Sequence, residues 1–221
     1  MTAHIELVLF DLDGTLVDTA PDLAAAANRQ RADRGLEPLP LDDLRPMASH
    51  GARGLIAVAL GRAPGDADYE SLRAQFLDYY EQALCVHSRL FDGMEATLAA
   101  LEQAGIRWGI VTNKIARFTG PLVERLGLRE RMACVVSGDT TPHAKPHPAP
   151  LLHAITEARS TATASIYVGD DLRDVQAGRA AGTGTVIAAY GYLGKDVDIT
   201  SWGGDHIIAQ PTDLLRWVGA K

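Results

Sequence analysis

The chain of 221 residues is long enough for one large domain or for a core domain with a smaller one, and 47% of its residues are hydrophobic. A formal net charge of -7 and a pI near 5.4 argue against a nucleic-acid-binding protein, whose binding face would be basic. No segment approaches the roughly 20 apolar residues needed to span a bilayer, and the N-terminus lacks the basic region of a signal peptide. The two distant cysteines, Cys85 and Cys134, indicate a reducing compartment, so we expect a cytoplasmic protein with no membrane or nucleic-acid partner.

The first predicted element is a buried strand, IELVLFD at residues 5–11, which ends at two closely spaced aspartates. The following segments have helical periodicity with no strand-like run between them: 21–35, 41–48, 52–61 and 68–84. Together they predict an all-helical insert of three or four helices. We expect this insert, residues 18–88, to be a cap domain, with residues 1–17 and 89–221 forming the core domain.

From residue 92 onward, helical segments alternate with short β-branched runs. The predicted helices cover residues 93–105, 117–127, 148–158 and 172–182, and the predicted strands cover 106–113, 132–139, 164–171 and 183–191. Strands joined by helix-length crossovers imply βαβ units. The predicted fold class is therefore α/β, a doubly wound, mostly parallel, Rossmann-like sheet that includes the first strand and has helices on both faces.

Polar residues stand where the predicted strands end and in one nearby loop. They are Asp11 and Asp13 after the first strand, Thr112 and Asn113 after the second, Asp170 and Asp171 after the fourth, and Lys145 in the loop HAKPHP. Ligands of open α/β sheets bind outside the carboxyl ends of the strands. We therefore expect one site at this edge to hold all of these groups.

The residue types at this edge predict a chemistry. Several carboxylates share one crevice only where a cation offsets their repulsion, and oxygen ligands suit Mg²⁺. Lys145 and Thr112 could donate to an anion, and a phosphoryl group would also bridge to the metal. Asp11 could then be a nucleophile that forms an aspartyl phosphate, while Asp13 protonates the leaving oxygen and later accepts a proton from water. DLDG could instead be a simple turn, but the other polar clusters argue against that reading.

Four segments resemble the ordered motifs of the haloacid dehalogenase superfamily, in its phosphatase branch: DLDGT at 11–15, VTN at 111–113, KP at 145–146 and GDDLRD at 169–174. The resemblance implies that Asp11 is the nucleophile and a metal ligand. It implies that Asp13 is the acid and base, with its backbone carbonyl also on Mg²⁺. It further implies the remaining roles: phosphate binding by Thr112 and the backbone of Asn113, charge compensation by Lys145, and completion of the metal site by Asp170.

The resemblance does not decide the roles of two further acids, Asp171 and Asp174. Related sequences often have Ser or Thr where Asp171 stands, so we expect Asp174 to be the supporting acid at the metal site and keep Asp171 as an alternative ligand. An aspartate at position 13 also favours a phosphate ester over an organohalide, because only the leaving group of an ester needs to be protonated.

Inside the helical insert, SHGARGL at 49–55 resembles the substrate-specificity loop of phosphoglycolate phosphatase-like caps. Gly51 and Gly54 would let this loop approach the substrate closely, and Arg53 could bind a carboxylate or phosphate. The alternative is that Arg53 is a solvated helix residue. The tyrosines of DYYEQAL at 78–84 are expected to pack in the core or at its edge.

Several features also resemble specific phosphatases. The cap loop and DTAPDL at 18–23 resemble bacterial phosphoglycolate phosphatases, so 2-phosphoglycolate is the expected substrate. The tail, AAYGYLG at 188–194 and SWGGDHIIAQPTDLL at 201–215, resembles N-acetylmuramic acid 6-phosphate phosphatases of peptidoglycan recycling, which gives the alternative. A sugar phosphomutase and a phospho-accepting receiver-like module stay open, although Asp13 and the insert argue against a receiver. We expect a small phosphorylated metabolite as the partner, and a monomer or homodimer.

Overall fold

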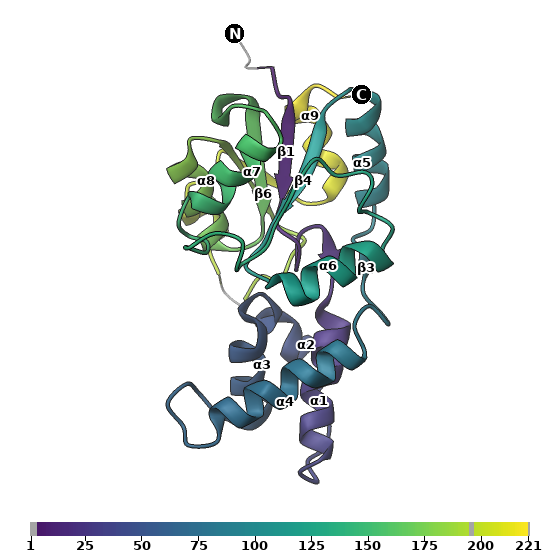
Figure 1. Cartoon of the computed structure of the whole chain (residues 1–221), viewed down its shortest axis with the longest axis vertical. Helices are drawn as coiled ribbons and strands as arrows, with labels where there is room; N and C mark the ends of the chain where they lie inside the picture. Colours follow the sequence, from purple (N-terminus) through teal and green to yellow (C-terminus); the bar gives the residue numbers. More distant parts are fainter. Residues whose placement is uncertain (1–3, 195–196, 221) are drawn as a thin grey trace.

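The core is a six-stranded parallel sheet with the strand order β5-β4-β1-β6-β7-β8 (Figure 1). The computed structural model describes residues 4–194 and 197–220. The strands are β1 (Leu7–Phe10), β4 (Arg107–Val111), β5 (Val135–Val136), β6 (Ser165–Gly169), β7 (Gly184–Ala188) and β8 (His206–Ile208). The chain runs outward from β1 through β4 and β5, and then returns to add β6, β7 and β8 on the other side. The predicted doubly wound α/β sheet is confirmed, with β1 near its centre.

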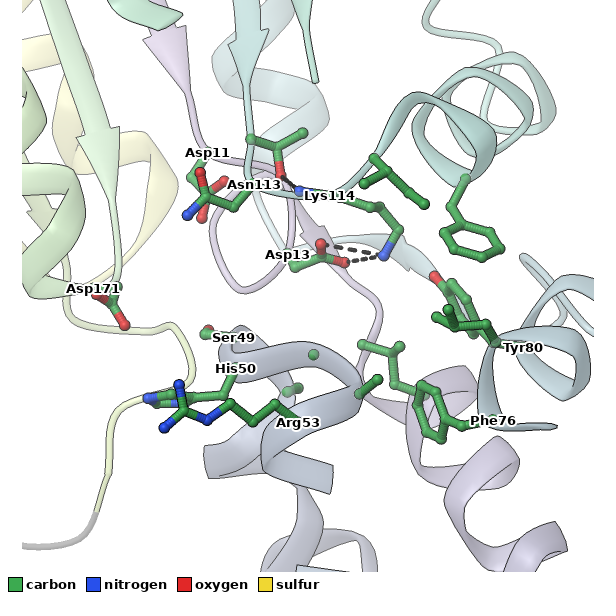
Figure 2. A pocket seen from close by; sticks show the side chains of 18 of the residues that line it. Asp11, Asp13, Ser49, His50, Arg53, Phe76, Tyr80, Asn113, Lys114 and Asp171 are labelled. Atoms are coloured by element: carbon green, nitrogen blue, oxygen red, sulfur yellow. Dashed lines mark hydrogen bonds and ion pairs between the residues drawn. The ribbon is translucent and has the colours of Figure 1, made fainter. Parts of the chain in front are cut away.

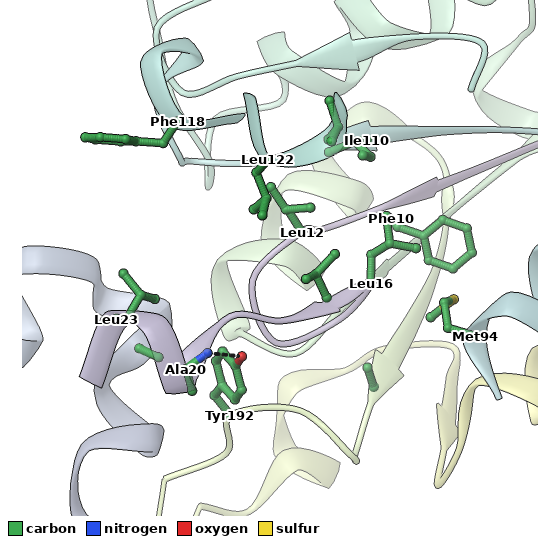
Figure 3. Close-up of a cluster of buried hydrophobic side chains, with 14 of the residues drawn as sticks. Phe10, Leu12, Leu16, Ala20, Leu23, Met94, Ile110, Phe118, Leu122 and Tyr192 are labelled. Carbon is green, nitrogen blue, oxygen red and sulfur yellow. Dashed lines mark hydrogen bonds between the residues drawn. The ribbon is translucent and has the colours of Figure 1, made fainter. Parts of the chain in front are cut away.

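Helices cover both faces of this sheet. They are α5 (Met94–Gln103), α6 (Ala116–Arg125), α7 (Ala149–Glu157), α8 (Leu172–Ala181) and α9 (Leu215–Val218), with the 3₁₀ turns η2 (Ala162–Ala164), η3 (Ile199–Trp202) and η4 (Pro211–Leu214). Side chains alternate along β1. Val8 and Phe10 join the cluster that includes α5 and α6 (Figure 3), whereas Leu7 and Leu9 join the cluster of α7 and α8. Because both faces are covered, β1 is apolar at every position.

The predicted helical insert lies at one end of the core, beyond α6 and β3 in Figure 1. It consists of α1 (Ala20–Ala32), α2 (Leu41–Leu44), the 3₁₀ turn η1 (Arg45–His50), α3 (Gly51–Leu60) and α4 (Tyr69–Gln82). The chain leaves and re-enters the core through two short antiparallel strands, β2 (Val17–Asp18) and β3 (Arg89–Leu90). The division into two domains at 17/18 and 88/89 remains a proposal, and it falls on this ribbon.

Two strand pairings were not predicted from the sequence: the separate ribbon of β2 and β3, and the pairing of β8 with β7. The ribbon of β2 and β3 has only two residues in each strand, and β8 has only three. Runs this short carry no recognisable alternation of apolar and polar residues. Their pairing is therefore a consequence of the surrounding fold.

A buried carboxylate ties helix α1 to the segment that returns from the insert. Asp22 is 1% exposed and accepts hydrogen bonds from the backbone N–H groups of Val86 (3.0 Å), His87 (2.8 Å) and Ser88 (2.9 Å), and from the Ser88 hydroxyl (2.6 Å). These N–H groups belong to a turn outside any helix or strand, so Asp22 supplies the acceptors that the turn lacks. The aspartate of DTAPDL therefore has a structural role.

Replacing Asp22 with alanine should lower the free energy of unfolding by about 3 kcal/mol, because buried N–H groups would lose their acceptor. Urea unfolding followed by circular dichroism measures the change. Asp42→Ala, at an exposed position in α2, is the matched control and should change stability by no more than about 0.5 kcal/mol. Equal effects of the two substitutions would contradict the role assigned to Asp22.

Candidate active site

A cavity of about 300 Å³ lies between the carboxyl edge of the sheet and the helical insert (Figure 2). The core contributes Asp11, Asp13, Thr112, Asn113, Lys114, Lys145, Asp171 and Asp174, and the insert contributes Ser49, His50, Arg53, Phe76 and Tyr80. Asp170 is buried beside the cavity, close to Asp11. The structure therefore brings together at one place all the site residues predicted from the sequence.

Lys145 stands at the centre of the core side of this site. Its ammonium lies 2.8 Å from Asp11 Oδ1, and it donates to Asp174 Oδ1 at 2.8 Å and to the Tyr167 hydroxyl at 2.7 Å. Burial alone would lower the pKa of Lys145, but the charges of Asp11 and Asp174 outweigh burial and raise it. The lysine therefore remains an ammonium although its side chain is almost fully buried.

The Asn113 side chain fixes the loop that carries Lys145. Asn113 Nδ2 donates to the backbone carbonyl of Lys145 at 3.0 Å, and Asn113 Oδ1 accepts from the backbone N–H of Lys145 at 2.9 Å. This reciprocal pair joins two segments that are 32 residues apart in sequence. Sequence reasoning considered only the backbone of Asn113, whereas its side chain positions the lysine.

Three carboxylates lie next to this lysine. Asp11, Asp170 and Asp174 are buried, and each offers an oxygen within 4.8 Å of the others. Burial raises the pKa of Asp11 to about 6, although Lys145 opposes the shift. Burial, together with the charges of Asp11 and Asp174, also raises the pKa of Asp170 well above its ordinary value. A cluster with this much uncompensated negative charge fits a hard divalent cation, which binds carboxylate oxygens.

Asp170 is fixed from several sides. Thr15 donates to Oδ1 at 2.9 Å, while Ser49 at 3.1 Å and the backbone N–H of Tyr192 at 2.9 Å donate to Oδ2. Gly14 has φ of +89°, and a Cβ built there would lie 2.3 Å from Asp170 Oδ2. Glycine is thus required at position 14 both for its backbone conformation and because the carboxylate approaches it so closely.

Asp13 is held by two residues that sequence reasoning missed. Lys114 Nζ lies 2.9 and 3.2 Å from the two carboxylate oxygens, and the Thr19 hydroxyl donates to Oδ1 at 2.5 Å. The backbone N–H of Lys114 donates to the Thr112 hydroxyl oxygen at 3.1 Å. Lys114 directly follows the VTN segment. This position next to the second motif is the sequence feature that could have identified Lys114 as a site residue.

Asp171 and Asp174 have different surroundings. Asp171 caps helix α8 by accepting from the backbone N–H of Arg173 at 2.8 Å, and the Arg173 guanidinium contacts both of its oxygens. Burial would raise the pKa of Asp171, but the hydrogen bonds and charge of Arg173 outweigh it and lower the pKa. Asp174 instead accepts from Lys145 and Tyr167. Asp174 therefore belongs to the carboxylate cluster, while Asp171 is paired with an arginine.

The interpretation of SHGARGL as a loop is wrong from residue 51 onward, because helix α3 begins at Gly51. A Cβ built on Gly54 would lie 2.6 Å from His50 Cβ and 2.8 Å from the Met47 carbonyl oxygen, so Gly54 allows α3 to pack against η1. The close approach at Gly54 is therefore within the insert, whereas Gly51 lines the cavity with φ of +57° and no atom within 4 Å of its Cβ position. Arg53 is an exposed residue in the first turn of α3 and lines the cavity.

Comparison with known proteins agrees with this arrangement. A family model described as haloacid dehalogenase-like hydrolase matches residues 8–188. The chain belongs to this family. A crystal structure of a predicted phosphoglycolate phosphatase from Haemophilus somnus has a TM-score of 0.84 and 29% identity, covering 98% of this chain and 99% of that one.

Two curated relatives extend over almost the whole chain. An N-acetylmuramic acid 6-phosphate phosphatase from Pseudomonas aeruginosa is 42% identical over 212 residues, covering 96% of this chain and 94% of the relative. A phosphoglycolate phosphatase from Xanthomonas campestris is 46% identical over 207 residues, covering 94% and 93%. The expected phosphatase of the haloacid dehalogenase superfamily is confirmed. No helix in the described part of the chain is long and apolar enough to cross a membrane.

Asp174→Asn should lower kcat/KM for an aryl phosphate at least about tenfold, because Lys145 loses one of its two charged partners. Asp171→Asn is the matched control. Asparagine caps helices about as well as aspartate, so this variant should retain the stability of α8 and lose much less activity. Steady-state kinetics on the two variants decides between the acids, and a larger loss at position 171 would contradict the roles drawn from the geometry.

Proposed function

We propose that this protein is a Mg²⁺-dependent phosphate monoester hydrolase that acts through an aspartyl phosphate. The observation that carries the proposal is the placement of Asp11 beside Lys145, at 2.8 Å, with Asp13 lining the same cavity. Asp11 attacks phosphorus while the ester oxygen leaves, and Asp13 gives that oxygen a proton. Water then attacks the phosphoryl group, Asp13 takes up the proton of the water, and phosphate leaves with Asp11 regenerated.

Other residues bind the phosphoryl group and compensate its charge. Lys145 and the Thr112 hydroxyl, which line the cavity, would contact phosphoryl oxygens together with the backbone of Asn113. Asp11, Asp170 and the backbone carbonyl of Asp13 would hold Mg²⁺, which would offset the negative charge of the carboxylates and the phosphoryl group. Asp174 supports this arrangement through Lys145.

Two substrates are candidates, and the sequence favours 2-phosphoglycolate. The supporting features are the cap segment, DTAPDL and the relative of that name from Xanthomonas campestris. The cavity is at the small end of the range for ligand pockets, which suits a small metabolite.

N-acetylmuramic acid 6-phosphate is favoured by one specific observation. Part of the cavity wall is apolar and aromatic, formed by Leu23, Tyr69, Phe76, Leu77 and Phe118. A two-carbon acid has a single methylene group to place against such a wall, whereas an amino sugar with acetyl and lactyl groups has several apolar surfaces. The relative from Pseudomonas aeruginosa supports the same substrate. The wall therefore favours the amino sugar, whereas the small volume of the cavity favours 2-phosphoglycolate.

Purified protein with Mg²⁺ should release phosphate from at least one of these two esters when both are assayed side by side. Asp11→Asn should abolish turnover because an amide cannot act as the nucleophile, and its circular dichroism spectrum should match that of the wild type. Failure to hydrolyse either ester would contradict both substrate assignments. A phosphoenzyme that persists for many minutes would instead favour a receiver-like module.

Mg²⁺ should raise the melting temperature more at pH 7.5 than at pH 5. With its pKa raised to about 6, Asp11 holds a proton at pH 5 in the metal-free protein, and the cation must displace that proton. In the metal-free protein, the stability that Asp11 contributes changes with pH in the opposite direction to that of a salt-bridged aspartate, whose lowered pKa makes a protein more stable as pH rises. The contribution of Asp11 to stability is present below its unfolded pKa and is lost as pH rises through 6.

Thermal unfolding in EDTA and in Mg²⁺ at both pH values measures these effects. Asp170→Asn is the control, since it removes a carboxylate from the cluster and should reduce the stabilisation by Mg²⁺ at pH 7.5. An equal stabilisation of the wild type at both pH values would contradict the assignment of these carboxylates as metal ligands.

A further inference from the structure

Two lysines line the cavity, and their surroundings differ. Lys145 donates to Asp174, to the Tyr167 hydroxyl and to the carbonyl of Val111, so its ammonium is directed towards the carboxylate cluster of the core. The ammonium of Lys114 contacts the Asp13 carboxylate and is otherwise directed towards the insert (Figure 2). Its side chain is only 8% exposed. Lys114 is thus a buried cation beside the acid and base, with donor capacity left for a ligand.

Tyr80 faces this ammonium from the insert. The tyrosine belongs to α4 and is 1% exposed, and its ring centroid lies 4.7 Å from Lys114 Nζ. Among the described residues its hydroxyl makes no hydrogen bond of regular geometry; the Lys114 ammonium faces it and can only donate to its oxygen, so the hydroxyl proton has no acceptor. Figure 2 shows this hydroxyl directed towards Lys114 and the cavity. A buried hydroxyl whose proton has no acceptor is uncommon because its desolvation is not compensated, so the arrangement indicates a ligand that supplies the acceptor.

Both groups can donate to a ligand, although the hydroxyl oxygen can also accept from Lys114. Burial raises the pKa of Tyr80 to about 12, so the hydroxyl keeps its proton at neutral pH, and Lys114 carries a positive charge. The ligand group between them must therefore be an acceptor, and an anionic oxygen suits an ammonium best. The phosphoryl group of the substrate is already served by Lys145 and the proposed metal site, so the acceptor belongs to the leaving group, next to Asp13.

The other cations of the cavity are less suited to this role. Arg173 is engaged by Asp171 and by the carbonyl of Ser49. Arg53 and Arg73 are exposed on the insert. Lys114 also lies over the ring of Tyr80 in a cavity with an apolar wall, where the lower dielectric strengthens an interaction between charges.

We propose that Lys114 and Tyr80 together bind a carboxylate of the leaving group, and that they thereby select phosphate esters of acids over esters of neutral alcohols. Because Lys114 comes from the core and Tyr80 from the insert, the carboxylate is bound across the boundary between them. The proposal rests on the proposed function, in that it takes the ester to be hydrolysed in this cavity. Both candidate substrates carry such a carboxylate, and the experiment distinguishes them.

The test compares pairs of esters in which one member lacks the carboxylate or, for the amino sugars, the whole lactyl ether that carries it. One pair is 2-phosphoglycolate and 2-hydroxyethyl phosphate; the other is N-acetylmuramic acid 6-phosphate and N-acetylglucosamine 6-phosphate. The measured quantity is the ratio of kcat/KM for the acid to that for its neutral partner. A loss caused by disturbing Asp13 affects both members of a pair and cancels in this ratio.

Lys114→Met should lower this ratio about 10- to 100-fold for the pair that contains the true substrate, because a hydrogen bond to a charged group is lost. Tyr80→Phe removes only the hydroxyl, and should lower the ratio about tenfold without reducing the melting temperature. Arg129→Gln removes an exposed positive charge outside the cavity lining and should leave the ratio unchanged. If Lys114 only positioned Asp13, both esters of a pair would slow equally, and an unchanged ratio would overturn the proposal.

A binding measurement separates this proposal from the proposed function. Calorimetry on Asp11→Asn protein compares the affinity for each acid ester with that for inorganic phosphate. If the wild type hydrolyses none of the four esters, the proposed function fails. The carboxylate subsite still stands if Asp11→Asn protein prefers an acid ester to phosphate and Lys114→Met removes the preference. Absence of any preference would overturn the subsite.

Discussion

The structure depends on one buried ammonium among several carboxylates. Lys145 is 5% exposed and lies 2.8 Å from oxygens of both Asp11 and Asp174, with Asp170 close by. Removing one partner from a buried group of charges costs several kcal/mol, so these residues constrain one another. Their placement requires the carboxyl ends of β1, β4 and β6 to be neighbours, which the strand order provides. One ammonium does not balance three carboxylates, and this imbalance is why the site fits a divalent cation.

The same cluster also positions the insert. Ser49 donates to Asp170, and Arg173 joins the Ser49 carbonyl to Asp171. At the connection to the core, the Tyr192 hydroxyl donates to Asp18 at 2.8 Å and accepts from the backbone N–H of Ala20. The insert therefore contacts the core both at its connecting strands and at a carboxylate of the proposed metal site. Such contacts hold the insert against the edge of the sheet that carries Asp11 and Asp13.

The sequence was sufficient to predict most of the sheet, the helical insert and the convergence of Asp11, Asp13, Thr112, Asn113, Lys145 and Asp170 at one edge. Periodicity identifies elements with enough residues to show a pattern, and the strand ends then converge because of topology. The sequence alone could not predict that the Asn113 side chain holds Lys145, or that Lys114 pairs with Asp13, which lies 101 residues away in the chain. Such pairs depend on side-chain directions that no local pattern encodes. Tyr80 illustrates the same limit: it was expected to pack in the core, and it is buried, yet it also lines the cavity.

Asp11 and Asp13 stand two residues apart and nevertheless have different environments. Asp11 continues directly from β1 into the buried cluster, where Lys145 is its cationic neighbour and its Oδ1 accepts no hydrogen bond of regular geometry among the described residues. Asp13 lies beyond the strand, partly exposed, where Lys114 and Thr19 fix its orientation. An oxygen with few donors is available to attack phosphorus, whereas a carboxylate held at the cavity surface can meet the leaving group. Each aspartate has its own lysine, and this pairing keeps the two roles that we propose for them separate in space.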